Sequence, residues 1–439
     1  MIHTHSSFQP FIVLLGWFLL VMVPLACVDP ENILLRGTND ILVVDGMLTD
    51  LAEPQIIKIN RSKADPLTGR FGTTPITKAT VEVVMDSTVV IACHETVDGS
   101  YQLPSDFKGQ IGHAYQLRFT LSDGTHYQST QQVMLAVPPI NRIYTRFNPS
   151  SLTSTELGGY TAAHDFYLDT QDPANERNYY RWDWKQWEKQ DWCRTCQNGV
   201  YSINNVIKHY SPGGIRYWSA GDSLFEDCFY PPFEPGQPVI DRPFVYDYQC
   251  RTQCWAIFYS YNLNVFADDY TNGKLLAGQK VAQIPYYQHA PCLVEIRQAA
   301  LDPAAYQYYK QLQDQTQKTG GLTDTPPAAL AGNVHNLANN QEGIVGYFTA
   351  SAVAATRYWL DRKDTTVLPL GATDPSGYSG LVGAELFFAI NKRQPKPEPS
   401  PPTVPEIQIF ENPLHPRPYT AICESKESQT PAKPVGWRD

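Results

Sequence analysis

The stretch YQLRFTLSDGTHYQSTQQVML, residues 115–135, decides the fold class of the N-terminal half. Apolar and polar residues alternate over 115–121 and again from Tyr127, which is the pattern of strands that bury one face. Between the two runs lies Ser122-Asp123-Gly124-Thr125. Asp-Gly between alternating runs is a strong hairpin signal, typical of a turn whose two central residues take positive φ. The segment therefore predicts an antiparallel β-hairpin.

The same period of two extends on the N-terminal side of this hairpin. Residues 41–44, 55–59 and 79–85 have the composition and spacing of strands, and no long helical period interrupts them. Pro138-Pro139 marks a boundary. We expect residues 39–137 to form a small immunoglobulin-like antiparallel β-sandwich.

A larger β-rich domain is predicted over 140–390. Its strand-like segments are 166–169, 178–184, 255–266, 293–296 and 344–349. One helix is clearly signalled, because Asp302 can cap it, Pro303 suits its first position, and Ala305, Tyr309 and Leu312 share one face. The fold class is therefore mostly β with one clear helix. The last segment, 391–439, contains 11 prolines and predicts an extended tail over the surface of the second domain.

The N-terminus predicts an exported lipoprotein. Residues 11–23 form an apolar run too short to span a bilayer and typical of a signal peptide. Ala26 before Cys27 resembles a lipobox, so we expect a signal peptide over 1–26, lipidation of Cys27 and a tether over 27–38. An ordinary secretory signal is the alternative. The net charge of −10 argues against a nucleic-acid partner.

Of the nine cysteines, one is Cys27 of the predicted lipobox and eight lie farther along the chain. Once Cys27 is assigned to the lipid, an even set remains, which suits disulfide-stapled loops in an exported protein. Cys93 lies apart, inside the first sandwich, and is a candidate for a free, buried thiol. Two closely spaced pairs, Cys193 with Cys196 and Cys250 with Cys254, could also supply the four ligands of a zinc site. Export from the cytoplasm favours disulfides over this alternative. The possible disulfide cysteines are Cys193, Cys196, Cys228, Cys250, Cys254, Cys292 and Cys423.

Four of the nine tryptophans fall within residues 179–192. Tyr180, Trp182 and Trp184 share one face of the predicted strand and are expected in the core. Trp187 and Trp192 lie where this strand meets the cysteine-rich loops, and they are candidates for a platform that stacks against a sugar or peptide. The alternative is that the disulfide-stapled loops fold over them.

Motifs for catalysis are missing. The sequence contains no nucleophile elbow, P-loop or His-Glu-x-x-His, so we predict no catalytic residue, no metal and no cofactor. Asp268-Asp269 near Asn272-Gly273 has the composition of a calcium turn, but a solvated hairpin turn is the simpler interpretation. A pair of carboxylates for glycoside hydrolysis would be a spatial feature that the sequence does not reveal.

Several short motifs follow one another along the chain: Leu42–Gly46, Ala79–Val83, Asp98–Tyr101, Gly112–Tyr115, Tyr127–Ser129, Cys254-Trp255, Ile284-Pro285, Ala305-Tyr306, Pro326-Pro327, Gly332–Val334 and Gly346–Phe348. In their order and spacing they resemble a family of Bacteroidota outer-membrane lipoproteins that carries only a domain-of-unknown-function name. The resemblance covers roughly residues 39–360. It implies a partnership with a TonB-dependent, SusC-like receptor, since such proteins are commonly encoded side by side. Family tails often carry Cys-x-x-Cys, whereas this chain keeps only Cys423.

Three functions follow as hypotheses. The first is a surface-exposed, lipid-anchored outer-membrane protein that captures or gates a ligand for a TonB-dependent transporter. The second is an adhesin or structural surface module. The third is a surface glycan hydrolase.

Overall fold

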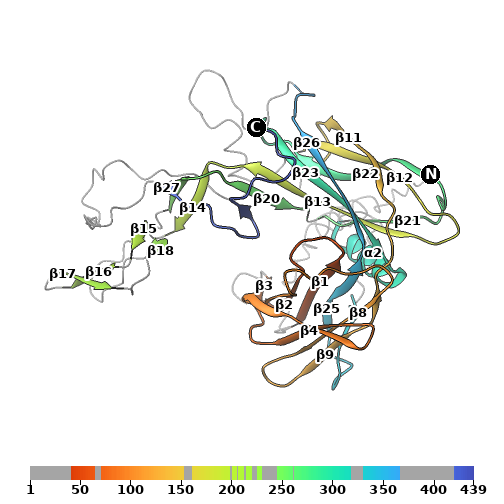
Figure 1. Cartoon of the computed structure of the whole chain (residues 1–439), viewed down its shortest axis with the longest axis horizontal. Coiled ribbons are helices and arrows are strands. Elements are labelled where there is room, and N and C mark those ends of the chain that lie inside the picture. Colours follow the sequence, from red (N-terminus) through yellow and green to blue (C-terminus); the bar gives the residue numbers. More distant parts are fainter. Residues whose placement is uncertain are drawn as a thin grey trace, which may run out of the picture.

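The structure, a computed structural model, describes residues 41–64, 71–152, 161–197, 200–204, 206–211, 214–219, 225–229, 245–260, 262–317, 330–365 and 420–439. Most regular elements within these ranges are strands, and the described part of the chain has a single helix, α2 (Pro303–Gln317). The mostly β prediction with one clear helix is confirmed. Figure 1 shows two bodies of strands that meet near α2 and an arm of strands that extends from one of them.

The first body is a sandwich of two six-stranded sheets around one core. One sheet has the order β25-β1-β2-β7-β6, with β3 on β2, and the other has the order β24-β9-β8-β4-β5, with β10 on β8. The first sheet comprises β1 (Leu42–Thr49), β2 (Ile56–Ala64), β3 (Phe71–Pro75), β6 (His94–Val97), β7 (Ser100–Gln102) and β25 (Ile344–Ser351). The second comprises β4 (Thr80–Met85), β5 (Val89–Ala92), β8 (Ala114–Thr120), β9 (His126–Ser129), β10 (Gln132–Val133) and β24 (Val334–Asn336).

The predicted hairpin is confirmed as β8 and β9. Phe119 pairs with Tyr127 across it, and their rings stack with centroids 4.8 Å apart. Gly124 takes a φ of 86°, whereas Asp123 is not among the residues with positive φ, so the expectation of two such residues is wrong. Asp123 instead accepts a hydrogen bond from the Thr125 amide at 2.9 Å, which closes a four-residue turn.

Two strands of this sandwich come from far along the chain. β25 pairs in parallel with β1 from Leu42↔Ile344 to Thr49↔Ser351, and β24 pairs with β9. Phe348 on β25 is fully buried in the sandwich core. The boundaries predicted from sequence therefore need a correction, because residues 334–351 complete the first body and 39–137 alone do not contain it. Parallel pairing across about 300 residues leaves no local signal.

The second body packs two further sheets against each other. One has the order β11-β12-β22, and the other has the order β26-β23-β13-β20-β28, with β21 on β13. Its core includes Phe166, Trp182 and Ile296. The strands are β11 (Ile140–Asn148), β12 (Ala163–Gln171), β22 (Leu275–Pro285), β26 (Val353–Leu360), β23 (Cys292–Leu301), β13 (Tyr179–Lys189), β20 (Trp255–Tyr259), β21 (Asn264–Ala267) and β28 (Gln429–Thr430).

Helix α2 begins as the sequence predicts. The Asp302 carboxylate accepts a hydrogen bond from the Ala305 amide at 2.8 Å, which is an N-cap contact. Ala305 and Tyr309 are buried and Leu312 packs against their cluster, so the predicted face is the one that faces the protein.

The arm consists of three small sheets in the cysteine-rich region (Figure 1). Its elements are β14 (Trp192–Gln197), β15 (Val200–Asn204), β16 (Val206–Ser211), β17 (Gly214–Ser219), β18 (Phe225–Phe229), β19 (Val245–Cys250) and β27 (Thr420–Ala421). Three disulfides form, Cys193–Cys250, Cys196–Cys228 and Cys254–Cys423. None of the four cysteines in the two short-spaced pairs bonds within its own pair, and all four are engaged in disulfides.

Cys292 corrects the predicted disulfide set. It is fully buried on β23, and among the described cysteines it and Cys93 carry free thiols. Cys93 is half-buried, and burial raises the pKa of each thiol to about 12. Cys292 lies in the core of the second body, away from the cysteine-rich arm. Both side chains therefore act as small apolar core groups.

The end of the chain lies as a strap across the second body. β27 pairs in parallel with β19, and β28 pairs with β20. Trp437 packs against Trp255 and Trp359, with ring centroids 5.9 and 5.0 Å apart. Residues 420–439 thus run over the second body, as the tail was predicted to do, whereas 391–419 lie outside the described residues.

Loss of the strap disulfide is expected to release this segment. Cys254→Ser with Cys423→Ser should lower the free energy of unfolding by about 2–4 kcal/mol, because the unfolded chain loses a cross-link. Limited proteolysis followed by mass measurement should show earlier loss of the C-terminal residues. Cys93→Ser is the control, since Cys93 forms no disulfide. A strap that stays equally protected in the double variant would contradict the prediction.

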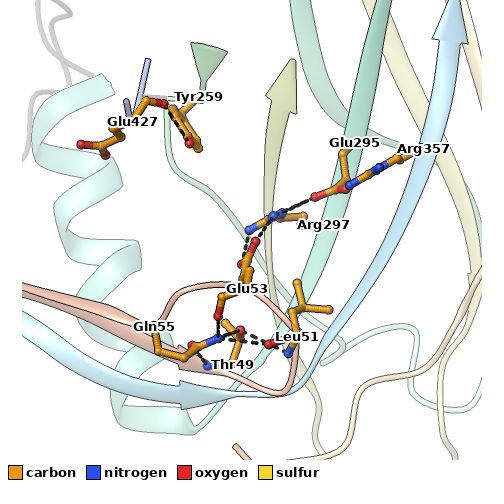
Figure 2. A network of polar contacts seen from close by, with 9 residues as sticks. All are labelled: Thr49, Leu51, Glu53, Gln55, Tyr259, Glu295, Arg297, Arg357 and Glu427. Carbon is orange, nitrogen blue, oxygen red and sulfur yellow. Dashed lines mark hydrogen bonds and ion pairs between the residues drawn. The ribbon is translucent and has the colours of Figure 1, made fainter. Parts of the chain in front are cut away.

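A network of charges joins the two bodies (Figure 2). Glu53, in the turn between β1 and β2, accepts two hydrogen bonds from Arg297 on β23, at 2.8 and 2.6 Å. Arg297 also contacts Glu295, which Arg357 on β26 reaches at 2.6 Å. Burial acts to raise the pKa of Glu295, but the two arginines outweigh it and hold that pKa below its usual value. These linked ion pairs hold the β1–β2 turn of the sandwich against the second body.

The predicted signal peptide, Cys27 and the tether lie outside the described residues. Among the helices that the structure does describe, none has the length and apolar character needed to cross a membrane.

Candidate functional site

A pocket of about 320 Å³ opens in the second body where β13 changes its partner strand. Tyr179–Trp182 pair with β21, whereas Lys185–Lys189 pair with β20, so Trp184 lies in the gap between the two. Ser260, at the end of β20, bridges this gap. Its amide donates to the Trp184 carbonyl at 3.0 Å, and its hydroxyl accepts from the Trp184 amide at 3.3 Å. These two hydrogen bonds hold Ser260 and the Trp184 backbone together at the break in the sheet.

The lining combines aromatic, amide, hydroxyl and ammonium groups. Trp182 is a fully buried part of it, and Trp184 is half-buried. Strands β13, β21 and β22 contribute, together with the β20–β21 connection and the end of α2. The described lining residues are Leu152, Trp182, Trp184, Ser260, Asn262, Leu263, Asn264, Lys280, Val281, Ala282, Gln283 and Gln317.

Hydrogen bonds from side chains to backbone carbonyls hold the elements that line the pocket together. The Asn264 amide donates to the carbonyls of Lys280 and Val281 at 3.3 and 3.1 Å, which ties β21 to β22. Gln283 donates to the Ser151 carbonyl at 2.5 Å. Gln313 on α2 donates to the Leu263 carbonyl at 2.7 Å. The walls are preorganised, and Asn262, which is exposed, stands at the opening.

Lys280 supplies the positive charge of the pocket, and Asp165 balances it from behind. The Lys280 ammonium lies 2.8 Å from the Asp165 carboxylate, which is only 3 % exposed and also accepts from Asn148 at 2.9 Å. Burial acts to raise the pKa of Asp165, but Lys280, Ser151 and Asn148 hold it below its usual value. The described lining contains no carboxylate, imidazole or thiol. The arrangement suits binding of a neutral polar molecule.

The residues predicted from sequence fall elsewhere. Trp187 is 5 % exposed and packs against Trp255 and Leu293, while Lys185 and Arg357 lie 5.0 and 4.9 Å from its ring centre. It offers no open face, so the stacking role predicted for it is wrong here. Trp192 is half-buried at the start of β14 and does not line the pocket, and its role stays a prediction.

The sequence predicts Trp184 in the core with Tyr180 and Trp182, and it does pack against their cluster, but its role in the pocket lining was not predicted. Those two are buried as expected, each 1 % exposed. All three do share one strand face, but Trp184 lies beside the switch from β21 to β20, where it is half-buried and lines the pocket. Asn262 and Asn264 lie within the predicted strand 255–266, at the point where this sheet is interrupted.

Comparison with known proteins identifies a family. The model of a domain of unknown function, DUF4249, matches residues 28–357, which is most of the chain. Comparisons with curated proteins and with solved structures give no match. The match spans both strand bodies and the cysteine-rich arm, so this chain belongs to the DUF4249 family.

Proposed function

We propose that this protein is a lipid-anchored outer-membrane lipoprotein that captures a small polar ligand, a sugar or peptide, for a TonB-dependent transporter. The pattern that ends at Cys27 supports the anchor, and the resemblance to receptor-associated lipoproteins supports the partnership. The pocket at Trp184 carries the ligand part of the proposal. Its volume of about 320 Å³ suits a molecule of one or two sugar rings or a short peptide.

The chemistry of the pocket favours a neutral sugar among these ligands. Trp184 offers an aromatic face, and Ser260, Asn262 and Lys280 offer hydroxyl, amide and ammonium groups around it. Aromatic faces stack on the apolar side of sugar rings while amides pair with hydroxyl groups. Since the described lining has no carboxylate, it gives no support to the glycan hydrolase alternative.

Trp184→Ala is expected to weaken ligand binding by up to about tenfold, because one aromatic contact is worth about 1.4 kcal/mol at most. Calorimetry with a panel of neutral mono- and disaccharides and dipeptides would identify the ligand and measure the loss. Trp192→Ala is the matched control and should bind like the unmodified protein. Binding that depends on Trp192 and not on Trp184 would move the site to the arm.

The transporter partnership needs its own test. The tagged native protein, recovered from outer membranes in mild detergent, should bring a β-barrel receptor with it. Recovery without any barrel would count against the partnership. A deletion strain that loses growth on one nutrient would favour capture over adhesion, because an adhesin leaves nutrient uptake unchanged.

A further inference from the structure

A pair of stacked tyrosines lies on the outer face of the three-stranded sheet of the second body. Tyr144 on β11 pairs with Tyr167 on β12, and their ring centroids are 5.4 Å apart. Phe166 and Leu168, on either side of Tyr167, are buried in the core. Because side chains alternate along a strand, the tyrosine pair is on the opposite face. Both tyrosines are half-buried, so part of each ring is open to solvent.

Two exposed arginines on β11 lie over these rings. The guanidinium carbon of Arg142 is 5.1 Å from the ring centre of Tyr144. That of Arg146 is 5.9 Å from the same ring centre and 5.8 Å from the ring centre of Tyr167. These distances are within the range of cation–π attraction. Stacking on a ring orients a guanidinium group and leaves its N–H groups free to donate.

Neither arginine is paired with the aspartate opposite it in the sheet. Arg142 is the register partner of Asp169, whose carboxylate accepts from the Gly278 amide at 2.8 Å. Arg146 is the register partner of Asp165, whose carboxylate is held in the ion pair described for the pocket. Among the residues that the structure describes, neither guanidinium group takes part in an ion pair or a hydrogen bond. Both therefore keep their N–H donors for a ligand.

This arrangement suits an anion that is recognised one acidic group at a time. A guanidinium group can bind a carboxylate, sulfate or phosphate through two parallel hydrogen bonds. Its long-range field is weak, because Asp165 and Asp169 lie on the neighbouring strand and the whole chain carries a net charge of −10. Nucleic acid and anionic membrane surfaces bind mainly through such a field and are disfavoured. A polymer with well-separated acidic groups meets less repulsion.

The spacing along β11 favours an extended ligand. Arg142 and Arg146 are four residues apart on one strand, which separates their Cα atoms by about 13 Å. Tyr144 lies between them, and the two tyrosine rings provide aromatic surface of the kind that contacts the apolar side of sugar rings. A polysaccharide lying along β11 can therefore present acidic groups to both arginines and its rings to the tyrosines.

We propose that Arg142, Tyr144, Arg146 and Tyr167 form a binding site for an acidic polysaccharide. The arginines bind its carboxylate or sulfate groups, and the tyrosines contact its sugar rings. None of the four residues lines the pocket at Trp184. The inference therefore does not depend on the ligand proposed for that pocket.

Polygalacturonate and chondroitin sulfate are the probes that test this site. In calorimetry at low salt, the purified mature chain should bind at least one of them, and added salt should weaken the binding. Arg142→Gln should weaken it about tenfold, because one set of charged hydrogen bonds is lost. Arg142→Lys should restore only part of the affinity, since it keeps the charge and loses the paired donors. The double variant Arg142→Gln with Arg146→Gln should abolish binding.

Arg177→Gln is the matched control, because Arg177 is an exposed arginine on the β12–β13 connection and its loss changes the net charge equally. This variant should bind like the unmodified chain, and all variants should unfold at the same temperature. An unmodified chain that binds neither polymer would overturn the proposal. So would equal losses in Arg142→Gln and Arg177→Gln, equally strong binding of neutral amylose, or binding to phosphatidylglycerol vesicles in place of both polymers.

Discussion

Replacing Gly346 with alanine is expected to lower the free energy of unfolding by about 3–5 kcal/mol, as the sum of overpacking and backbone strain. Gly346 pairs with Val44 in the parallel contact between β25 and β1. A methyl group there would lie 1.8 Å from the Val44 carbonyl oxygen, a separation that no pair of atoms tolerates. The φ of 110° adds strain for any residue with a side chain. Urea unfolding followed by tryptophan fluorescence and circular dichroism would measure the loss.

Gly343→Ala is the control, because a methyl group at Gly343 has no atom within 4 Å. The comparison of the two variants also tests how much β25 contributes to the stability of the first sandwich. If β25 is an integral strand of the first sandwich, damage at Gly346 should weaken the sandwich and its junction with the second body together. Equal midpoints for the two variants would show that the parallel pairing with β1 contributes little to stability.

Arg362→Met is expected to cost about 3–5 kcal/mol, because it leaves a buried charge without its partner. The Arg362 side chain is fully buried and lies 3.0 Å from the Glu188 carboxylate, which is 3 % exposed. Arg362 also donates to the carbonyls of Gln288 and Ala290, at 2.8 and 3.1 Å. Removing it would leave the Glu188 carboxylate with hydrogen bonds from Gln186, Tyr287 and Gln288 but without its charge partner, and would take this donor from two carbonyl groups. Thermal and denaturant unfolding of the variant would measure the cost.

The double variant Arg362→Met with Glu188→Leu separates charge from packing. It should recover part of the loss, since it removes the unpaired negative charge while keeping apolar volume, and only part because Gln186, Tyr287 and Gln288 then lose their acceptor. Lys433→Met is the surface control. Lys433 pairs with Asp439 on the exposed end of the chain, where an ion pair is worth about 0–1 kcal/mol. A double variant as unstable as Arg362→Met would show that the lost hydrogen bonds, rather than the unpaired charge, dominate.

The candidate pocket illustrates why site prediction from the sequence was partial. Tyr180, Trp182 and Trp184 have the same spacing, and the strand period assigns them one face. All three contribute to the core cluster, but Trp184 is only half-buried and lines the pocket at the point where β13 changes its partner strand from β21 to β20. Trp187 shows the converse error. Its position before the cysteine-rich loops suggested exposure, but Trp255 and the strap with Trp437 cover its surroundings.

By itself, the sequence determined the features that nearest neighbours impose. The alternation around Phe119 fixed the hairpin, Asp302 and Pro303 fixed the start of α2, and the even cysteine set indicated disulfides. These signals are local, because the atoms that interact lie within a few residues. Only the tertiary structure decided that β25 completes the first sandwich, and that Cys292 stays unpaired while Cys423 reaches Cys254. Each of these contacts joins segments that lie far apart in the sequence. The residues near each segment therefore do not indicate which distant segment will pack or pair with it.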